Sequence, residues 1–192
     1  MADLQRRLAV LEDREAIREL DARYCRHLDQ GQWDELADCF TPDGTFDGLS
    51  VVRSRSDLVR FFAGLAGTGL TAFWHHVSNL EITVLAGADE ARATSLLWQP
   101  CVVDGVAHVA AGRYQDTVTR TPQGWRYQIK QVRFSYFAPL DQGWDQHRFT
   151  LDSARAAALL PLPDASGSAA AQTSEHATAP SQPAKPTATR KP

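Results

Sequence analysis

Two adjacent histidines, His75 and His76, lie in the stretch LTAFWHHVSNLEITV (residues 70–84), which otherwise has the apolar and β-branched content of a strand. Imidazole gains or loses a proton near neutral pH, so a histidine that faces a cavity can act as a general base or a general acid. Strict alternation along the strand places His76 on the same face as Leu80 and Ile82, and His75 on the opposite face. A β-bulge near the histidines would reverse this choice, so the residues alone leave it open.

A hydroxyl group and a carboxylate occur near the end of the first predicted helix. Tyr24 and Asp29 are five residues apart, and Asp29 comes just before the Gln30-Gly31 break. A carboxylate that accepts a hydrogen bond from one imidazole nitrogen fixes the tautomer of the ring and stabilises its protonated form. Two ordinary interpretations stay open, in which Asp29 is an exposed acid at a helix end and Tyr24 is a core side chain.

Other polar and aromatic side chains are candidates for the wall of a pocket. Trp74, Trp98 and Tyr136 could line an apolar pocket for a ring-bearing substrate, although each could equally belong to the core. His108, in the third long predicted strand, could add a polar group to such a pocket, or could lie in water at a hairpin end. The cysteines are scattered without the spacing of metal ligands, and there is no Gly-rich phosphate loop, so no cofactor or metal is expected.

Composition excludes several classes of protein. The chain has 192 residues, of which 43% are hydrophobic and 22% are charged, as in a soluble globular protein. A formal net charge of -3 predicts no general attraction to nucleic acid or to an anionic membrane. The sequence shows neither a cleavable apolar leader nor a membrane-spanning stretch, so a cytoplasmic location is expected.

The pattern of elements indicates an α+β fold. Helices are predicted at residues 2–30, with a break near Glu12-Asp13, and at 33–40 and 54–67, with a turn at residues 41–44. Long strands joined by tight turns dominate from residue 71 onward and predict an antiparallel meander, at residues 72–85, 90–103, 106–120 and 125–138. A curved sheet of this kind wrapped around N-terminal helices forms a cone with one pocket inside.

The chain divides into three parts by composition. Residues 1–150 are expected to form the α+β domain, and residues 151–162 a peripheral segment. Residues 163–192 are rich in Ala, Pro, Ser and Thr and lack aromatic residues, so they are expected to be a disordered tail.

Three stretches, at residues 14–46, 75–83 and 112–127, resemble the SnoaL-like proteins of the nuclear transport factor two-like superfamily. Within that superfamily the sequence is most similar to the bile acid 7α-dehydratases, and more distantly to scytalone dehydratase and hexachlorocyclohexane dehydrochlorinase. The resemblance implies the cone-shaped fold. It is less specific for the reaction, because the superfamily also includes isomerases, cyclases and binding domains.

The resemblance implies four catalytic residues. A helix tyrosine with an aspartate five residues later, followed by a WDEL segment, corresponds to Tyr24, Asp29 and residues 33–36. A histidine six residues before an EIT segment selects His75, in conflict with simple alternation, and an arginine near the end of the last strand corresponds to Arg133. Two positions depart from the pattern of the named enzymes, which have titratable groups where this chain has Gln99 and Cys101.

The resulting expectation is a cofactor-independent lyase or isomerase that acts by His/Asp acid-base catalysis on a polycyclic, steroid-like or aromatic polyketide molecule. The alternative is a non-catalytic domain of the same fold that binds a small ligand or takes part in assembly. Members of this superfamily commonly associate through the sheet, so a homodimer or homotrimer is also expected.

Overall fold

The computed structural model describes residues 1–65 and 67–142. The helices are α1 (Ala2–Asp29), α2 (Trp33–Ala37), α3 (Arg55–Leu65) and the short 3-10 helix η1 (Leu140–Gln142). The strands are β1 (Phe40–Asp47), β2 (Val51–Arg53), β3 (Leu70–Phe73), β4 (His76–Thr83), β5 (Glu90–Val103), β6 (Val106–Thr121) and β7 (Gly124–Pro139).

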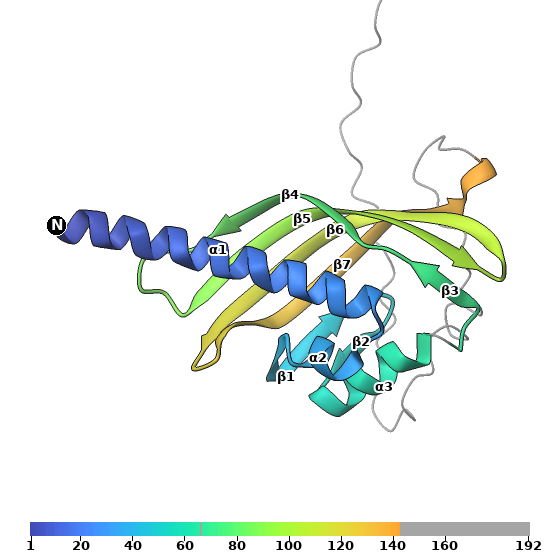
Figure 1. The fold of residues 1–192 in the computed structure, drawn as a ribbon, viewed down its shortest axis with the longest axis horizontal. Helices are drawn as coiled ribbons and strands as arrows, with labels where there is room; N and C mark the ends of the chain where they lie inside the picture. Colours follow the sequence, from blue (N-terminus) through green and yellow to red (C-terminus); the bar gives the residue numbers. More distant parts are fainter. Residues whose placement is uncertain (66, 143–192) are drawn as a thin grey trace, which may run out of the picture.

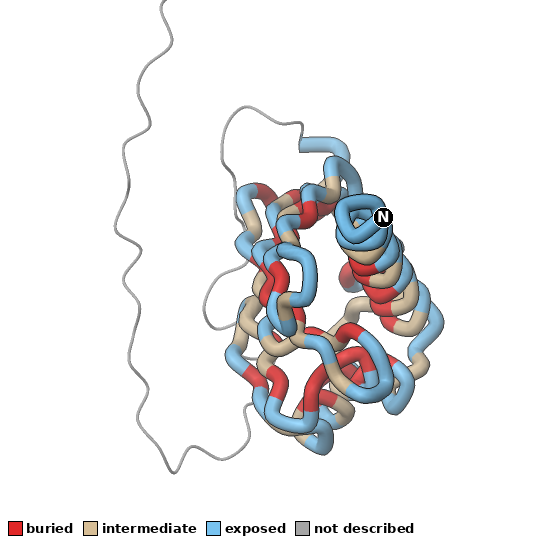
Figure 2. The backbone as a smooth tube through the Cα atoms, turned by 90° about the vertical axis from the view of Figure 1, so that its left-hand side faces the viewer, coloured by how far each residue is buried: buried red, intermediate tan, exposed pale blue. Residues whose placement is uncertain are grey.

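The strands form one curved sheet with the order β2-β1-β7-β6-β5-β3, and β4 also pairs with β5. Every pairing is antiparallel except that of β1 with β7, which is parallel. The helices lie on one side of this sheet (Figure 1). Figure 2 shows the buried residues of α1 on the side of the helix that faces the sheet. The predicted α+β cone is confirmed.

Helix α1 contacts the sheet through three acidic side chains that are eight residues apart. Asp13 accepts hydrogen bonds from Arg120 and from the indole of Trp125, at 2.8 and 3.1 Å. Asp21 and Asp29 make the next two contacts, which belong to the candidate site described below. The helix is continuous through Asp13, so the predicted break there is absent.

The first turns of α1 extend beyond the strands (Figure 1). Leu4, Leu8 and Leu11 are accordingly exposed, although their spacing continues the apolar stripe of the helix. No helix in the described part of the chain has the length and apolar content to cross a membrane.

A bulge in β4 decides which histidine faces inward. Ser78 pairs with Leu96 whereas Glu81 pairs with Thr94, so one extra residue lies in β4 between these two pairs. Asn79 has a φ of 53°, a left-handed conformation that asparagine tolerates better than most residues. The extra residue reverses the alternation, because Val77 and Ile82 pair with Leu97 and Ala93 on the same face of β5. Counting back from Ile82 therefore gives the wrong face for His76.

A second bulge, between β6 and β7, changes the face of Tyr136. Gly112 pairs with Phe134 and Ala111 pairs with Tyr136, so Ser135 is the extra residue. A Cβ atom on Gly112 would overlap the carbonyl oxygen of Arg133, so the close approach of the two strands at this bulge requires glycine. After the bulge, Tyr136 belongs to the outer face.

Several expectations about elements need correction. Strands β1 and β2 were not predicted, and residues 41–44, predicted as a turn, lie within β1 where its register to β7 is irregular. The predicted strand at 72–85 is divided into β3 and β4. The expected boundaries at residues 150 and 162 and the expected tail lie outside the described residues. The outer face of the sheet exposes Leu96, Trp98 and Ile129, and the dimer or trimer stays a prediction.

The second bulge can be tested by substitution of Gly112. Gly112→Ala should lower the free energy of unfolding by about 1–3 kcal/mol, because the added methyl group meets backbone rather than a flexible side chain. Gly67→Ala is the matched control, since its Cβ would meet only the Gly64 carbonyl oxygen at 3.5 Å, an ordinary contact. Urea denaturation measures both variants, and equal stabilities would contradict the assigned role of Gly112.

Candidate active site

The Asp29 carboxylate and the His75 ring are joined by a hydrogen bond of 2.6 Å between Oδ1 and Nδ1. The backbone N–H of His75 also donates to the same carboxylate, at 3.2 Å to Oδ1 and 3.1 Å to Oδ2. The ring packs edge-on against Phe73, with the ring centroids 5.6 Å apart. These contacts fix the ring from two sides and leave Nε2 without a hydrogen bond to any described residue. The hydrogen bond predicted between Asp29 and His75 is therefore present.

The position of Asp29 is unusual for an acidic residue. It is the last residue of α1, where the helix dipole favours positive charge and disfavours a carboxylate. Its side chain is 20% exposed, and that of His75 only 5%, so the pair is largely removed from water. The simple interpretation of Asp29 as a solvated helix end is thus excluded by geometry. His76, by contrast, is exposed and pairs with Trp98 on the outer face.

His75 lies at the wall of a cavity between the helices and the concave face of the sheet. The cavity has a volume of about 120 Å³. Among the described residues, its polar lining is limited to side chains of Tyr24, His75, Gln99, Cys101 and Tyr114. The remaining lining is aliphatic or aromatic and comes from every layer of the fold: Leu28, Phe46, Leu49, Phe61, Phe62, Leu65, Leu70, Phe73, Val103, Ala110, Val132, Phe134 and Phe137.

Tyr24 and Tyr114 line the cavity from opposite walls, one on α1 and the other on β6. Both rings are nearly completely buried, at 1% and 2% exposure. Burial, together with neighbouring acidic groups, raises the pKa of both hydroxyls well above that of a free tyrosine. Both side chains are consequently neutral hydrogen-bond donors. Tyr24 was predicted as a site residue, and Tyr114 was missed.

The predicted position of Arg133 in the cavity is wrong. Val132 and Phe134 line the cavity, and Arg133, between them, projects to the other face of β7. Its guanidinium makes a two-pronged ion pair with Asp47, with N–O distances of 3.0 and 2.8 Å. The pairing lowers the pKa of Asp47 and keeps Arg133 outside the site.

The four residues predicted to bind substrate do not line the cavity either. Trp74 and Trp98 are 55% and 45% exposed, and Trp98 is on the outer face. Tyr136 belongs to a separate buried cluster with Val109, Ala111 and Ala138, because of the bulge at Ser135. His108 stacks on Phe137, a lining residue, with the ring centroids 5.3 Å apart, and its Nδ1 contacts the backbone oxygen of Val106.

A buried charged cluster lies behind the two tyrosines and was not foreseen. The Lys130 ammonium is fully buried and donates hydrogen bonds to Asp21 Oδ1 at 3.0 Å and Asp116 Oδ2 at 2.9 Å. It also lies over three aromatic rings, with distances to the ring centroids of 3.9 Å for Tyr114, 4.6 Å for Tyr127 and 4.8 Å for Tyr24. The Tyr127 hydroxyl donates to Asp21 at 3.0 Å.

Burial and pairing act in opposite directions in this cluster. For Lys130, burial alone would lower the pKa, but the carboxylates of Asp116 and Asp21 outweigh it and the pKa is raised. For Asp116, burial outweighs the attraction of Lys130 and raises the pKa to about 6. The ammonium is therefore permanently charged, whereas Asp116 can take up a proton in mildly acidic solution.

In the described part of the chain, neither the cavity cysteine nor a cluster of potential metal ligands adds to the chemistry of the site. Burial raises the pKa of Cys101, in the cavity wall, to about 11, so its thiol is a poor nucleophile at neutral pH. Within residues 1–65 and 67–142, no three side chains of His, Cys, Asp or Glu come together as they would around a metal ion.

Residues 9–131, more than half of the chain, match the SnoaL-like domain family. The chain belongs to that family. An uncharacterized protein of Mycobacterium tuberculosis is 27% identical over 135 residues, which cover 68% of this chain and 90% of the relative. The matched residues thus include Tyr24, Asp29, His75 and Tyr114.

Solved structures of other proteins share the architecture. A protein of Novosphingobium aromaticivorans provisionally assigned as a scytalone dehydratase has a TM-score of 0.62 at 23% identity, over 72% of this chain and 91% of that one. A hexachlorocyclohexane dehydrochlorinase of Novosphingobium barchaimii has a TM-score of 0.63 at 20% identity, over 69% and 93%. An NTF2-like protein of N. aromaticivorans is 28% identical with a TM-score of 0.56, over 83% and 96%. These likenesses concern the fold, and it is the geometry of Asp29 and His75 that suggests chemistry.

The charged cluster predicts a specific pH dependence of stability. Because the folded state raises the pKa of Asp116 above its ordinary value of 3.8 to about 6, the folded protein binds this proton more tightly than the unfolded chain does. The stability contributed by this carboxyl should therefore increase as the pH falls through that range. An asparagine side chain cannot titrate, so the free energy of unfolding of the wild type relative to Asp116→Asn should rise by about 2–3 kcal/mol between neutral pH and about pH 4.

The control for this measurement is Asp47→Asn, which should show the opposite trend. Arg133 lowers the pKa of Asp47, so the stability contributed by Asp47 is present near neutral pH and is lost as the pH falls through the folded pKa. Urea titrations of the wild type and both variants at several pH values give the comparison. A pH-independent difference for Asp116→Asn would show that this carboxyl is not perturbed as described.

Proposed function

We propose that the protein is a cofactor-independent lyase or isomerase that removes a carbon-bound proton from a compact, ring-bearing small molecule. The observation that carries the proposal is the hydrogen-bonded Asp29–His75 pair at the wall of an almost entirely apolar cavity, with one imidazole nitrogen that no described residue hydrogen-bonds. A buried acid-base pair that faces a cavity is a common feature of active sites.

His75 is the general base in this mechanism. Its Nδ1–H donates to Asp29, so the lone pair of Nε2 is available to accept a proton from the substrate. When Nε2 is protonated, the Asp29 carboxylate stabilises the positive ring through the same hydrogen bond. The edge-on contact with Phe73 and the backbone hydrogen bonds to Asp29 hold the ring in one orientation, which removes the need for reorganisation during the reaction.

The chemical steps follow from this arrangement. The base breaks a C–H bond next to a carbonyl or an activated ring, and the proton moves to Nε2. The electron pair of that C–H bond stays on the substrate and forms an enolate-like system. The Tyr24 hydroxyl can donate to the oxygen on which negative charge develops. In a lyase the enolate then expels hydroxide, which takes the proton from His75 and leaves as water. In an isomerase His75 returns the proton to another carbon atom.

The size of the cavity limits the part of the substrate that can be enclosed. A volume of about 120 Å³ is comparable to engineered cavities, roughly 150 Å³ in size, that hold one benzene molecule. One six-membered ring therefore fits inside, and any further rings of a polycyclic substrate would extend through the mouth or require the walls to move. The aromatic lining from Phe46, Phe61, Phe62, Phe73, Phe134 and Phe137 favours a planar or flat ring.

A non-catalytic role in ligand binding is the second candidate, favoured by the scarcity of polar groups in the cavity wall. The two candidates differ in what His75 does. A binding protein would hold ligands without chemistry whether or not the ring can accept a proton, whereas the enzyme requires it.

The test uses nitrobenzisoxazole, a flat aromatic probe whose ring opens when a base removes its C–H proton and the N–O bond breaks. The phenolate product is followed by its absorbance. The wild type should accelerate this elimination, and His75→Ala should reduce kcat by about 10²–10⁴-fold because the general base is lost. Asp29→Asn should keep probe binding and lower kcat, since an amide cannot stabilise the imidazolium as a carboxylate does.

His76→Ala is the matched control, because the neighbouring ring is exposed and faces outward. It should keep the rate of the wild type, and circular dichroism should show that all three variants are folded. The proposal fails if the wild type does not accelerate the elimination, or if His75→Ala retains the full rate. Binding of the probe with no turnover would instead support the ligand-binding role.

A further inference from the structure

We propose that the hydroxyl groups of Tyr24 and Tyr114 form one subsite, which binds a hydrogen-bond-accepting oxygen atom of the ligand. The subsite deepens the proposed function, on which it rests, because it assigns the ring ligand a carbonyl group and gives that group a place in the cavity. The pair comes from two elements that are far apart in sequence, which is why sequence motifs did not indicate it.

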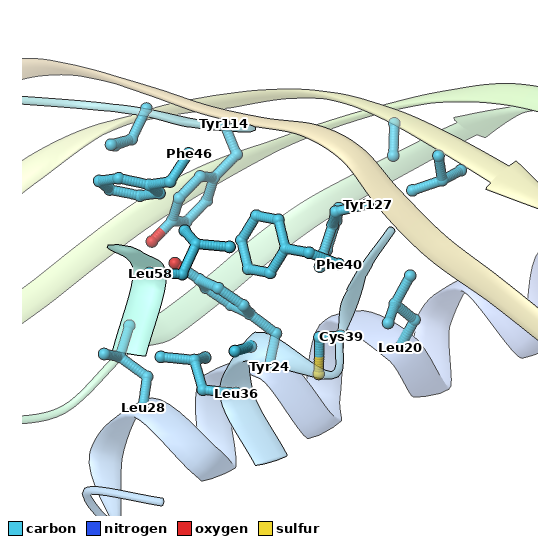
Figure 3. Packing of buried hydrophobic residues seen from close by; sticks show 14 of the residues in the cluster. Leu20, Tyr24, Leu28, Leu36, Cys39, Phe40, Phe46, Leu58, Tyr114 and Tyr127 are labelled. Carbon is cyan, nitrogen blue, oxygen red and sulfur yellow. The ribbon is translucent and has the colours of Figure 1, made fainter. Parts of the chain in front are cut away.

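The first support is that the two hydroxyls converge. Tyr24 reaches the cavity from α1 and Tyr114 from β6, and both side chains line it. In Figure 3 the oxygen atoms of the two rings point toward the same region, beside Leu58. In the described part of the chain, neither hydroxyl has a hydrogen-bond partner. The Tyr127 hydroxyl, in the same cluster, instead donates to Asp21.

The second support is the apolar surrounding. The other side chains that line this end of the cavity, such as Leu28, Phe46 and Val132, offer no hydrogen-bonding group. A ligand oxygen that enters a cavity of this kind loses its hydration and needs donors there. Two convergent hydroxyls supply them, so the cavity discriminates against ring ligands of the same shape that lack an acceptor.

The third support is that both hydroxyls remain protonated, so each can donate a hydrogen bond to a carbonyl or negatively charged oxygen of the ligand. The carboxylates of Asp21 and Asp116 lie close behind the rings and oppose formation of a tyrosinate. The Lys130 ammonium, at 3.9 Å from the Tyr114 ring centroid and 4.8 Å from that of Tyr24, fixes both rings by cation–π contact. Lys130 is therefore a positioning residue for the subsite and does not itself face the cavity.

The subsite also has a defined relation to His75. Tyr114 is four residues along β6 from Ala110, which pairs with Gln99 in the cavity wall near His75. This separation corresponds to roughly 13 Å of strand. The two hydroxyls and His75 line one cavity that admits a single six-membered ring, so the proposal places the carbonyl oxygen of the ligand on the two hydroxyls and a ring C–H bond toward Nε2.

The test compares two probes of nearly equal shape, para-fluoroacetophenone, which has a carbonyl group, and para-fluoroethylbenzene, which has none. Fluorine NMR titration gives both dissociation constants. The wild type should bind the ketone more tightly than the hydrocarbon, and Tyr114→Phe and Tyr24→Phe should each weaken ketone binding by about two- to tenfold, the effect of one lost hydrogen bond. Binding of the hydrocarbon should not change in either variant.

Tyr127→Phe is the matched control, since it removes a hydroxyl from the same buried cluster that bonds Asp21 instead of facing the cavity. It should lower stability and leave the preference for the ketone intact. A second measurement needs no variant: the infrared carbonyl stretch of the bound ketone should shift to lower frequency than in hexane. The subsite is refuted if the ketone does not bind, if its stretch is unshifted, or if Tyr114→Phe retains the preference.

The outcomes separate this inference from the proposed function. His75→Ala should retain the preference for the ketone, because the oxygen subsite does not include the imidazole. The subsite alone would be refuted if His75→Ala loses the elimination while Tyr114→Phe keeps the preference for the ketone over the hydrocarbon. A tyrosine-dependent preference in a protein that catalyses no elimination would refute the enzyme and retain the subsite.

Discussion

The burial of the Lys130 ammonium between Asp21 and Asp116 is the interaction on which the placement of α1 against the sheet depends. All three groups are removed from water, so each must find its partner, and an uncompensated charge there would cost several kcal/mol. Asp21 is on α1, whereas Asp116 and Lys130 are on the sheet. Their contact therefore sets the position of α1 along the sheet and its rotation about the helix axis. Eight residues, or roughly 12 Å, further along the same helix, Asp29 reaches His75. The geometry of the proposed catalytic pair is thus a consequence of a charge contact that takes no part in the chemistry.

Two kinds of polar group line the cavity at different depths. Asp29 and His75 lie at the end of α1, where a little water reaches the carboxylate and a proton can be exchanged. Tyr24 and Tyr114 lie deeper, where burial and the nearby carboxylates keep them neutral. A proton acceptor at one place and neutral donors at another is the distribution that enolisation of a carbonyl compound needs. Apolar side chains fill the rest of the wall and keep bulk water from competing for these hydrogen bonds.

The sequence was sufficient for the α+β class and, with the family resemblance, for the Asp29–His75 pair, but it did not indicate β1 and β2 and was insufficient where a bulge changes a face. Apolar periodicity and turn residues indicate the helices and long strands. The alternation of side chains between the two faces of the sheet, however, holds only where the pairing of the strand is regular. The extra residue near Asn79 misdirected alternation toward His76, and the one at Ser135 turned Tyr136 outward. Lys130 was missed because an isolated lysine in a strand normally faces water. The available signal was Asp21, which lies within the apolar stripe of Ile17, Leu20, Tyr24 and Leu28 and therefore needed a buried partner.

The outward position of Arg133 has a consequence for the type of reaction that this cavity can support. The described residues that line it include no lysine or arginine, so none of them supplies a fixed cation to hold a full negative charge. On the proposed mechanism, the positive partner of the enolate is the imidazolium that its formation creates. The proton then lies beside the charge it left behind, which favours its rapid return to a departing hydroxyl or to a neighbouring carbon atom on the same face of the ring.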